Sequence, residues 1–242
     1  MNKLKRLAPN LNAFTFRFDR ALLDEIKASY AKNVQAILDD SDSQYLFEGG
    51  QLVSRPLDRA SEDYYVQSYK KNPLLWVSAN NPSTYAIYQN FLDNLGIDSD
   101  TKQLVDYENR IVMYCGFLVI CDRAEGYSWH VDYSPNANAY TLITPLLPLD
   151  RDHGNLVYAM GENQAGIYNY QVGEAIMFGD GFLHCTEPFA PNKQKRVLLS
   201  MTFGTDKMEY WPILKESIDG QSNFLILPSG HERGSRKGPE QH

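Results

Sequence analysis

The chain has 242 residues, of which 43% are hydrophobic and 22% charged, a composition typical of a folded domain and not of a disordered chain. Its 23 basic and 30 acidic residues give a net charge of −7, which argues against a nucleic-acid partner because such a partner needs clustered basic side chains. No stretch approaches the roughly 20 apolar residues that span a bilayer, and the N-terminal segment lacks the apolar run of a secretory signal, so we expect a cytoplasmic protein without a membrane partner.

Two segments in the first half of the chain have the periodicity of helices. Apolar residues recur at helical spacing over 19–38, and a second run over 83–95 ends at Gly96. The polar, tyrosine-rich segment 54–69 fits either a loop or a helix. We therefore expect residues 1–109 to form a helical N-terminal part.

Short apolar segments separated by turn signals dominate the chain after Arg110. Because no helical pattern lies between them, they predict a sandwich or jelly roll and not a parallel sheet with helical connections. Pro145 and Pro148 favour an edge position or a kink for the second of these strands. The predicted strands are 110–121, 140–149, 156–160, 173–178 and 195–204.

The expected fold is mainly β with N-terminal helices, around a sandwich or jelly-roll core. No repeat or low-complexity linker marks an internal boundary, so residues 1–242 are expected to form a single domain. Within it we expect a β core over 110–205 and a C-terminal extension over 206–242, loose after Pro228. The three cysteines are expected to be free thiols, since none has zinc-site spacing and Cys115 and Cys121 would lie about 20 Å apart on one strand.

His130 and Asp132 are the first candidate metal ligands. On a strand, residues i and i+2 point to the same face, so this His-x-Asp pair can present an imidazole and a carboxylate to one point. The pattern by itself is weak, because such pairs also arise by chance on protein surfaces.

His184 and Arg196 complete the candidate site. Two imidazoles and one carboxylate form the facial set used for Fe(II), which leaves three coordination positions open. Arg196, Leu198, Ser200 and Thr202 would share one face of the strand that follows His184. A buried arginine needs an anion, which is either a dicarboxylate ligand or a side chain such as Asp180, Glu187 or Asp206.

The order and spacing of these residues resemble the Fe(II)/2-oxoglutarate-dependent dioxygenase superfamily, over about residues 110–205. The resemblance implies that 1–242 is a single oxygenase domain and that 110–205 form a double-stranded β-helix core of the jelly-roll or cupin-like type. The resemblance implies that His130, Asp132 and His184 bind Fe(II) and that Arg196 binds the distal carboxylate of the co-substrate 2-oxoglutarate. It also implies that O2 converts 2-oxoglutarate to succinate and CO2 while a substrate is oxidised. Many members have Ser or Thr two residues after the arginine, where this chain has Leu198, so Ser200, Thr202 or Tyr114 would have to supply that hydroxyl.

Other residues are weaker candidates. His153 lies in a predicted turn and is expected to be exposed to solvent, and His231 and His242 lie in the tail. Glu187 is a rival carboxylate ligand or a residue that supports one. Tyr127, Trp129 and Tyr133 flank the metal pair and are expected to serve in packing more than in substrate recognition.

The function expected is hydroxylation or another oxidation of a C–H bond of a small organic molecule. A cupin-like metalloenzyme that does not use 2-oxoglutarate and a non-catalytic jelly-roll binding module are the alternatives. The sequence leaves open the substrate, the choice among hydroxylation, desaturation and cyclisation, and the oligomeric state.

Overall fold

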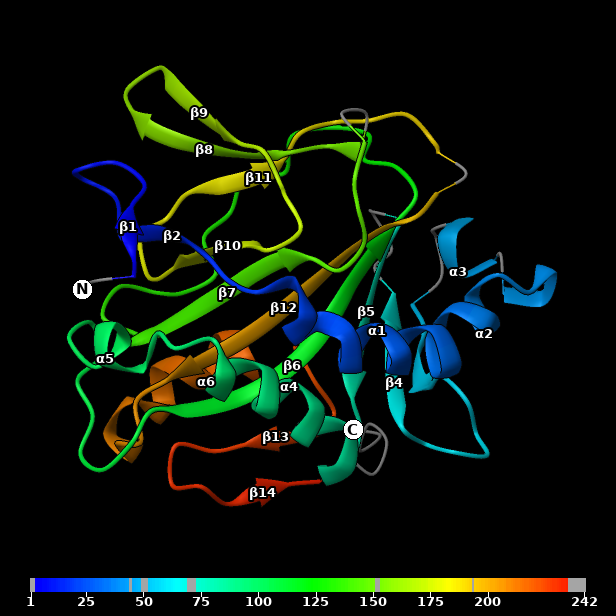
Figure 1. Ribbon diagram of the computed structural model, residues 1–242, viewed down its shortest axis with the longest axis horizontal. Coiled ribbons are helices and arrows are strands. Elements are labelled where there is room, and N and C mark those ends of the chain that lie inside the picture. The colour runs from blue at the N-terminus through cyan, green and yellow to red at the C-terminus, as the bar shows by residue number, and fades with distance from the viewer. Residues whose placement is uncertain are drawn as a thin grey trace, which may run out of the picture.

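Two antiparallel sheets pack against each other in the computed structural model, which describes residues 3–43, 45–48, 52–68, 73–150, 153–192 and 194–234 (Figure 1). The major sheet has nine strands within these residues, in the spatial order β1 (Lys5–Arg6), β2 (Ala13–Arg17), β10 (Glu174–Phe178), β7 (Ala139–Pro145), β12 (Arg196–Gly204), β6 (Val112–Cys121), β5 (Leu74–Ala79), β4 (Tyr64–Ser68) and β3 (Ser54–Pro56). The minor sheet consists of β11 (His184–Thr186), β8 (Leu156–Gly161) and β9 (Gln164–Tyr168), and β13 (Leu225–Ile226) pairs with β14 (Glu232–Arg233).

The central strand β12 shows how the two faces of the major sheet differ. Every residue of β12 is buried. Its side chains alternate, so that Val197, Leu199 and Met201 belong to the apolar cluster beneath the helices, while Leu198 packs with residues of the minor sheet. The side chains that share the face of Leu198 therefore point into the space between the two sheets.

Helices cover the outer face of the major sheet (Figure 1). One continuous helical run contains a 3₁₀ turn (Arg20–Leu23), α1 (Asp24–Tyr30), a π-helical stretch (Ala31–Gln35) and α2 (Ala36–Leu38). The helix α4 (Pro82–Asn94) begins with a capping box between Asn81 and Thr84 and ends before Gly96, whose φ is +65°. It crosses β6 at Gly116, where an added Cβ would lie 2.5 Å from the ring of Tyr88.

The remaining helical segments are short. They are 3₁₀ turns at Ser41–Ser43 and Met208–Tyr210, together with α3 (Tyr45–Glu48), α5 (Asp98–Thr101) and α6 (Trp211–Ile218). The helix α6 packs through Leu214 and Ile218 on the inner face of the major sheet, in a cluster with Tyr114 and Tyr133. Among the described residues, none of the helices combines the length and the apolar character that crossing a bilayer requires.

Both predicted helices and the mainly β core are confirmed, but the N-terminal part is not simply helical. Strands β1 to β5 all lie within 1–109 and extend both ends of the major sheet. The segment 54–69, expected to be loop or helix, forms β3 and β4 within its described residues, and β4 buries alternate side chains from Tyr64 onward. The sequence does not predict these strands, because an alternation over five residues is a weaker signal than the polar composition of the segment. The extended conformation of β4 is instead stabilised by its pairing with β5.

Two other expectations also need correction. The strand β7 lies between β10 and β12 and not at an edge. The proline is tolerated because Pro145 is the last residue of the strand, where the sheet needs no further backbone N–H donor. The tail does not become loose at Pro228, since β14 returns to pair with β13. The elements β9, β11 and α6 were not predicted. The three cysteines are free, as expected, and all are buried.

Candidate metal centre

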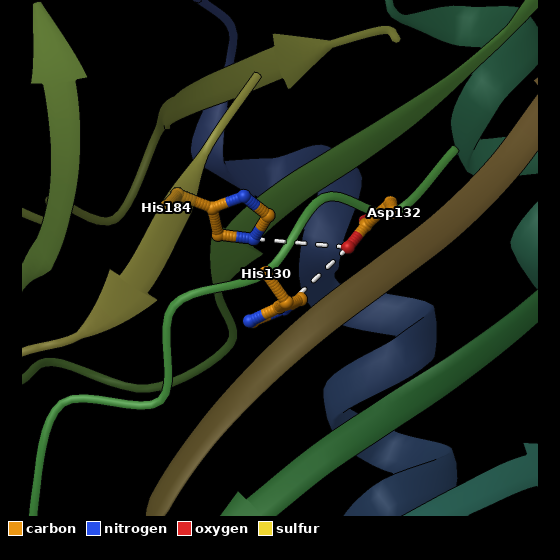
Figure 2. A group of neighbouring side chains, drawn as sticks. All are labelled: His130, Asp132 and His184. Atoms are coloured by element: carbon orange, nitrogen blue, oxygen red, sulfur yellow. Dashed lines mark ion pairs between the residues drawn. The ribbon is translucent and has the colours of Figure 1, made fainter. Parts of the chain in front are cut away.

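His130, Asp132 and His184 come together in the space between the two sheets (Figure 2). Asp132 Oδ1 lies 3.6 Å from His130 Nε2 and 3.8 Å from His184 Nε2. All three ligand atoms lie within 4.8 Å of one another, and within the described residues this is the one cluster of at least three potential ligands. Two imidazole nitrogens and one carboxylate oxygen converging from one side form the donor set typical of a facial Fe(II) site.

Backbone pairing between two distant segments places the two histidines next to each other. His130 N–H donates to His184 O at 2.9 Å, and His184 N–H donates to His130 O at 3.0 Å. His184 is the first residue of β11, whereas His130 forms only an isolated bridge and Asp132 lies in a bend. The prediction that His130 and Asp132 lie on one strand is therefore wrong, although their side chains do converge.

Each imidazole is oriented by the backbone two residues before it. His130 Nδ1 lies 2.8 Å from Ser128 O, and His184 Nδ1 lies 3.0 Å from Phe182 O. Because a carbonyl can only accept, each Nδ1 carries the proton and each Nε2 presents a lone pair toward Asp132. Hydrogen bonding of the second ring nitrogen is the usual way in which a protein fixes a histidine ligand.

The surroundings of His184 favour its neutral form. Its ring packs against Phe178 and Phe182, with centroids 4.6 and 5.3 Å away, and its side chain is only 6% exposed. Burial lowers the pKa of His184 from its ordinary value, and this outweighs the nearby Asp132 carboxylate, which acts in the opposite direction. His184 is therefore available as a metal ligand at neutral pH.

Arg196 lies at the start of β12 and is 2% exposed, yet no carboxylate among the described residues pairs with it. One guanidinium nitrogen lies 3.3 Å from Thr186 Oγ1 and 3.8 Å from Cys121 Sγ, and the Tyr170 ring lies 5.2 Å from Cζ. Its Nε has no hydrogen-bond partner within the part of the chain that the structure describes. A buried cation with an unpaired donor is costly without an anion, so its surroundings fit a missing negatively charged ligand.

The side-chain anions proposed as rivals are engaged elsewhere. Asp180 accepts hydrogen bonds from Asn12 and the backbone of Asn136, and Asp206 accepts from the backbone N–H groups of residues 108–110. Glu187 accepts from the backbone and the side chain of Asn155, and it lies outside the metal cluster. These contacts remove the ion-pair alternative for Arg196 and the rival carboxylate for the metal.

A cavity of about 120 Å³ lies between His130, one of the candidate ligands, and Arg196. His130 and Arg196 both line it, as do Thr186, Cys121 and Ser128. Thr186 was missed in the sequence, although it follows His184 by two positions on β11 and so shares its face. Its hydroxyl lies beside Arg196, as does that of Tyr170.

The hydroxyl groups expected near Arg196 lie farther away. Ser200 shares the inward face of β12 and is 1% exposed, but it follows Arg196 by four residues, roughly 13 Å along the strand. Tyr114 lies near the opposite end of β6, seven residues or roughly 23 Å from Cys121, which pairs with Arg196. Its hydroxyl donates to Thr205 O at 2.7 Å. The structure does not bring Tyr114 to Arg196.

The remaining candidates have different environments from those expected. His153 is 1% exposed and not in solvent, because its ring is held between Asp150 N–H and Gln194 O. His231 is exposed, and His242 lies outside the described residues. Tyr127 and Trp129 stack on each other and are 58% and 42% exposed, so they are not the packing residues that we expected.

Comparisons with known proteins identify the fold. No protein-family model and no curated protein matches the chain. The non-heme alpha ketoglutarate dependent epimerase SnoN from nogalamycin biosynthesis is similar in structure with a TM-score of 0.52 and 9% identity, over 81% of this chain and 79% of that chain. AviO1 from Streptomyces viridochromogenes Tue57 is similar with a TM-score of 0.53 and 12% identity, over 80% of this chain and 90% of that chain.

HygX from Streptomyces hygroscopicus, whose structure holds nickel and 2-oxoglutarate, gives a TM-score of 0.50 and 8% identity, over 81% of this chain and 83% of that chain. The chain thus has the jelly-roll fold of the Fe(II)/2-oxoglutarate-dependent oxygenases. The expected fold is confirmed, and the identities are too low to transfer more than the fold.

Acidification should weaken divalent-metal binding by the purified protein. A histidine must be neutral to bind a metal. Burial lowers the pKa of His184, so a proton competes with the metal there only when the pH falls below the ordinary histidine pKa of about 6.5. Cobalt(II) titrations should therefore give similar affinities at pH 7.5 and 7.0 and a progressively weaker affinity toward pH 5. An affinity that rises on acidification would contradict the ligand assignment.

Proposed function

We propose that the protein is an Fe(II)- and 2-oxoglutarate-dependent oxygenase of the hydroxylase type that oxidises a C–H bond of a small organic molecule. In hydroxylation, one oxygen atom of O2 enters the product and the other enters succinate, while 2-oxoglutarate loses CO2. The observation that carries the proposal is the buried Arg196, whose Nε has no partner among the described residues, in a cavity that is also lined by His130 of the His130–Asp132–His184 cluster. A metal site alone would fit other reactions, whereas a metal site together with a nearby buried arginine fits a dicarboxylate that chelates the metal.

The donor set fits Fe(II) and leaves room around it. His130 Nε2, Asp132 Oδ1 and His184 Nε2 would hold the metal from one side, and His130 is 53% exposed, so that side of the site is open. Bound Fe(II) together with 2-oxoglutarate would supply the O2-activating chemistry. The protein residues hold the ligands in place, and Phe178 and Phe182 exclude water behind His184.

Arg196 and Thr186 would hold the distal carboxylate of the co-substrate. The guanidinium offers its unpaired Nε–H and further N–H donors, and the Thr186 hydroxyl lies 3.3 Å from one of them. A charge-assisted bond from a planar arginine suits a carboxylate, and a neighbouring hydroxyl adds a second donor. Thr186 thereby replaces the hydroxyl that related enzymes carry at the position of Leu198.

Replacing His130 by Ala should abolish metal binding and activity while the protein remains folded. His130 is the half-exposed member of the cluster, so its truncation leaves no buried cavity. We expect about one Fe(II) per chain in the wild-type protein, as one facial site implies, and none in His130→Ala or His184→Ala. His231→Ala, at an exposed histidine outside the site, is the matched control. Full activity in His184→Ala would refute the assignment.

Replacing Arg196 by Met should remove 2-oxoglutarate binding without destabilising the protein that lacks co-substrate. Loss of one buried charge-assisted pair costs on the order of 2–5 kcal/mol, or roughly 30- to several thousand-fold in affinity. Because Arg196 has no anionic partner among the described residues, removing its charge should leave the melting temperature unchanged or raised. Arg196→Lys should recover only part of the affinity.

Thermal shift with and without 2-oxoglutarate measures both quantities in one experiment. A large fall in the melting temperature of Arg196→Met without co-substrate would indicate a structural arginine. An unchanged 2-oxoglutarate affinity would favour the cupin-like alternative, and a protein that releases no succinate with any substrate of a broad panel would favour it as well.

The product should carry an added oxygen or have lost two hydrogens, and it should not be halogenated. A halide at the metal needs the position that the carboxylate of the His-x-Asp pair fills, and Asp132 Oδ1 points into the cluster. Once a substrate is found, turnover in excess chloride or bromide with product analysis by mass spectrometry tests this. A halogenated product from the unmodified protein would contradict both Asp132 as a ligand and the reaction class.

A further inference from the structure

The two carboxylate oxygens of Asp132 have different partners. Oδ1 faces the Nε2 atoms of both histidines, whereas Oδ2 lies 2.8 Å from the hydroxyl of Thr141. Thr141 lies on β7 and is 2% exposed. Its backbone position is fixed on both sides, because β7 pairs with β10 and β12. The hydroxyl is thus presented to Asp132 from the most constrained part of the major sheet.

The direction of this hydrogen bond follows from counting protons. A carboxylate ligand can only accept, so Thr141 donates its single hydroxyl proton to Asp132 Oδ2. The Tyr133 hydroxyl lies 2.9 Å from Thr141 Oγ1, and since the threonine proton is already used, Tyr133 must donate to Thr141. Tyr133 is completely buried. The three side chains therefore form a directional chain from Tyr133 through Thr141 to Asp132.

We propose that Thr141 is a positioning residue that keeps Asp132 a single-oxygen ligand. This inference rests on the proposed metal site. A carboxylate that bound through both oxygens would occupy two of six positions around the metal, and with two histidines it would leave only two open. Two atoms of 2-oxoglutarate and one O2 need three. By holding Oδ2 away from the cluster, the Thr141 hydroxyl preserves the third position.

The test measures the cobalt(II) affinity of three threonine variants, each prepared free of metal. Thr141→Val keeps the size and β-branching of the side chain but removes the hydroxyl, and Thr141→Ser restores the hydroxyl. Thr144→Val is the matched control, because Thr144 lies on the same strand, is 0% exposed and donates its hydroxyl to Glu174 O at 2.8 Å, away from the cluster. It loses one buried hydrogen bond of the same kind.

Cobalt(II) affinity and the visible absorption of the cobalt-loaded protein are the measurements, neither of which needs turnover. Loss of a partner that orients a metal ligand typically costs 10–100-fold in affinity, and we expect this loss in Thr141→Val. Its cobalt absorption should also change, because the carboxylate can then rotate and bind through both oxygens. Thr141→Ser should recover most of the affinity and the wild-type spectrum. Thr144→Val should match the wild type in both measurements.

Wild-type affinity and an unchanged spectrum in Thr141→Val would overturn this inference and leave the metal site intact. A wild-type protein that binds no divalent ion would overturn the proposed function itself, so the two failures can be told apart. If Thr141→Val does not fold by circular dichroism, Thr141→Ala removes the same hydroxyl without overpacking. Wild-type binding in that variant, or equal losses in Thr144→Val, would count against Thr141 in the same way.

Discussion

The reciprocal pair of backbone hydrogen bonds between His130 and His184 is the contact on which the rest of the site depends. It joins a segment without regular strand structure to the first residue of β11, 54 positions later in the chain. Both rings then point to the same side of the paired backbone, as directly opposite residues do in an antiparallel bridge. Each ring is turned by a carbonyl two residues earlier, so the local backbone alone sets the direction of both Nε2 atoms.

Arg196 shows the energetic consequence of burying a charged side chain in a core. Its charge is removed from water without a carboxylate partner among the described residues, and its recorded neighbours are the Thr186 hydroxyl, the Cys121 thiol and Tyr170. Such an arrangement lowers the stability of the empty protein and is retained where an anion completes it. In the proposed function, burial makes Arg196 favour an anionic ligand, whereas the same residue on the surface would form an ordinary ion pair.

Residue type and order in the sequence were sufficient to predict that His130, Asp132 and His184 lie together, although the reason given for one pair was wrong. His130 and Asp132 converge through a bend and a hydrogen bond from Thr141, which strand alternation does not describe. Helical periodicity located α1 and α4, whereas β3 and β4 depend on pairing with β5, a long-range contact that leaves little local pattern. The burial of His153 likewise depends on Gln194, 41 residues away.

The candidate ligands are divided between the two sheets. His184 belongs to the minor sheet and His130 is bridged to it, while Asp132 is tied to the major sheet through Thr141. An ion at this point would cross-link the two layers of the sandwich, much as a disulfide joins distant segments. By thermodynamic linkage, an ion at a thousand times its dissociation constant would add about 4 kcal/mol to the free energy of unfolding. The same ion would then serve the chemistry and also set how firmly the minor sheet is held over the cavity.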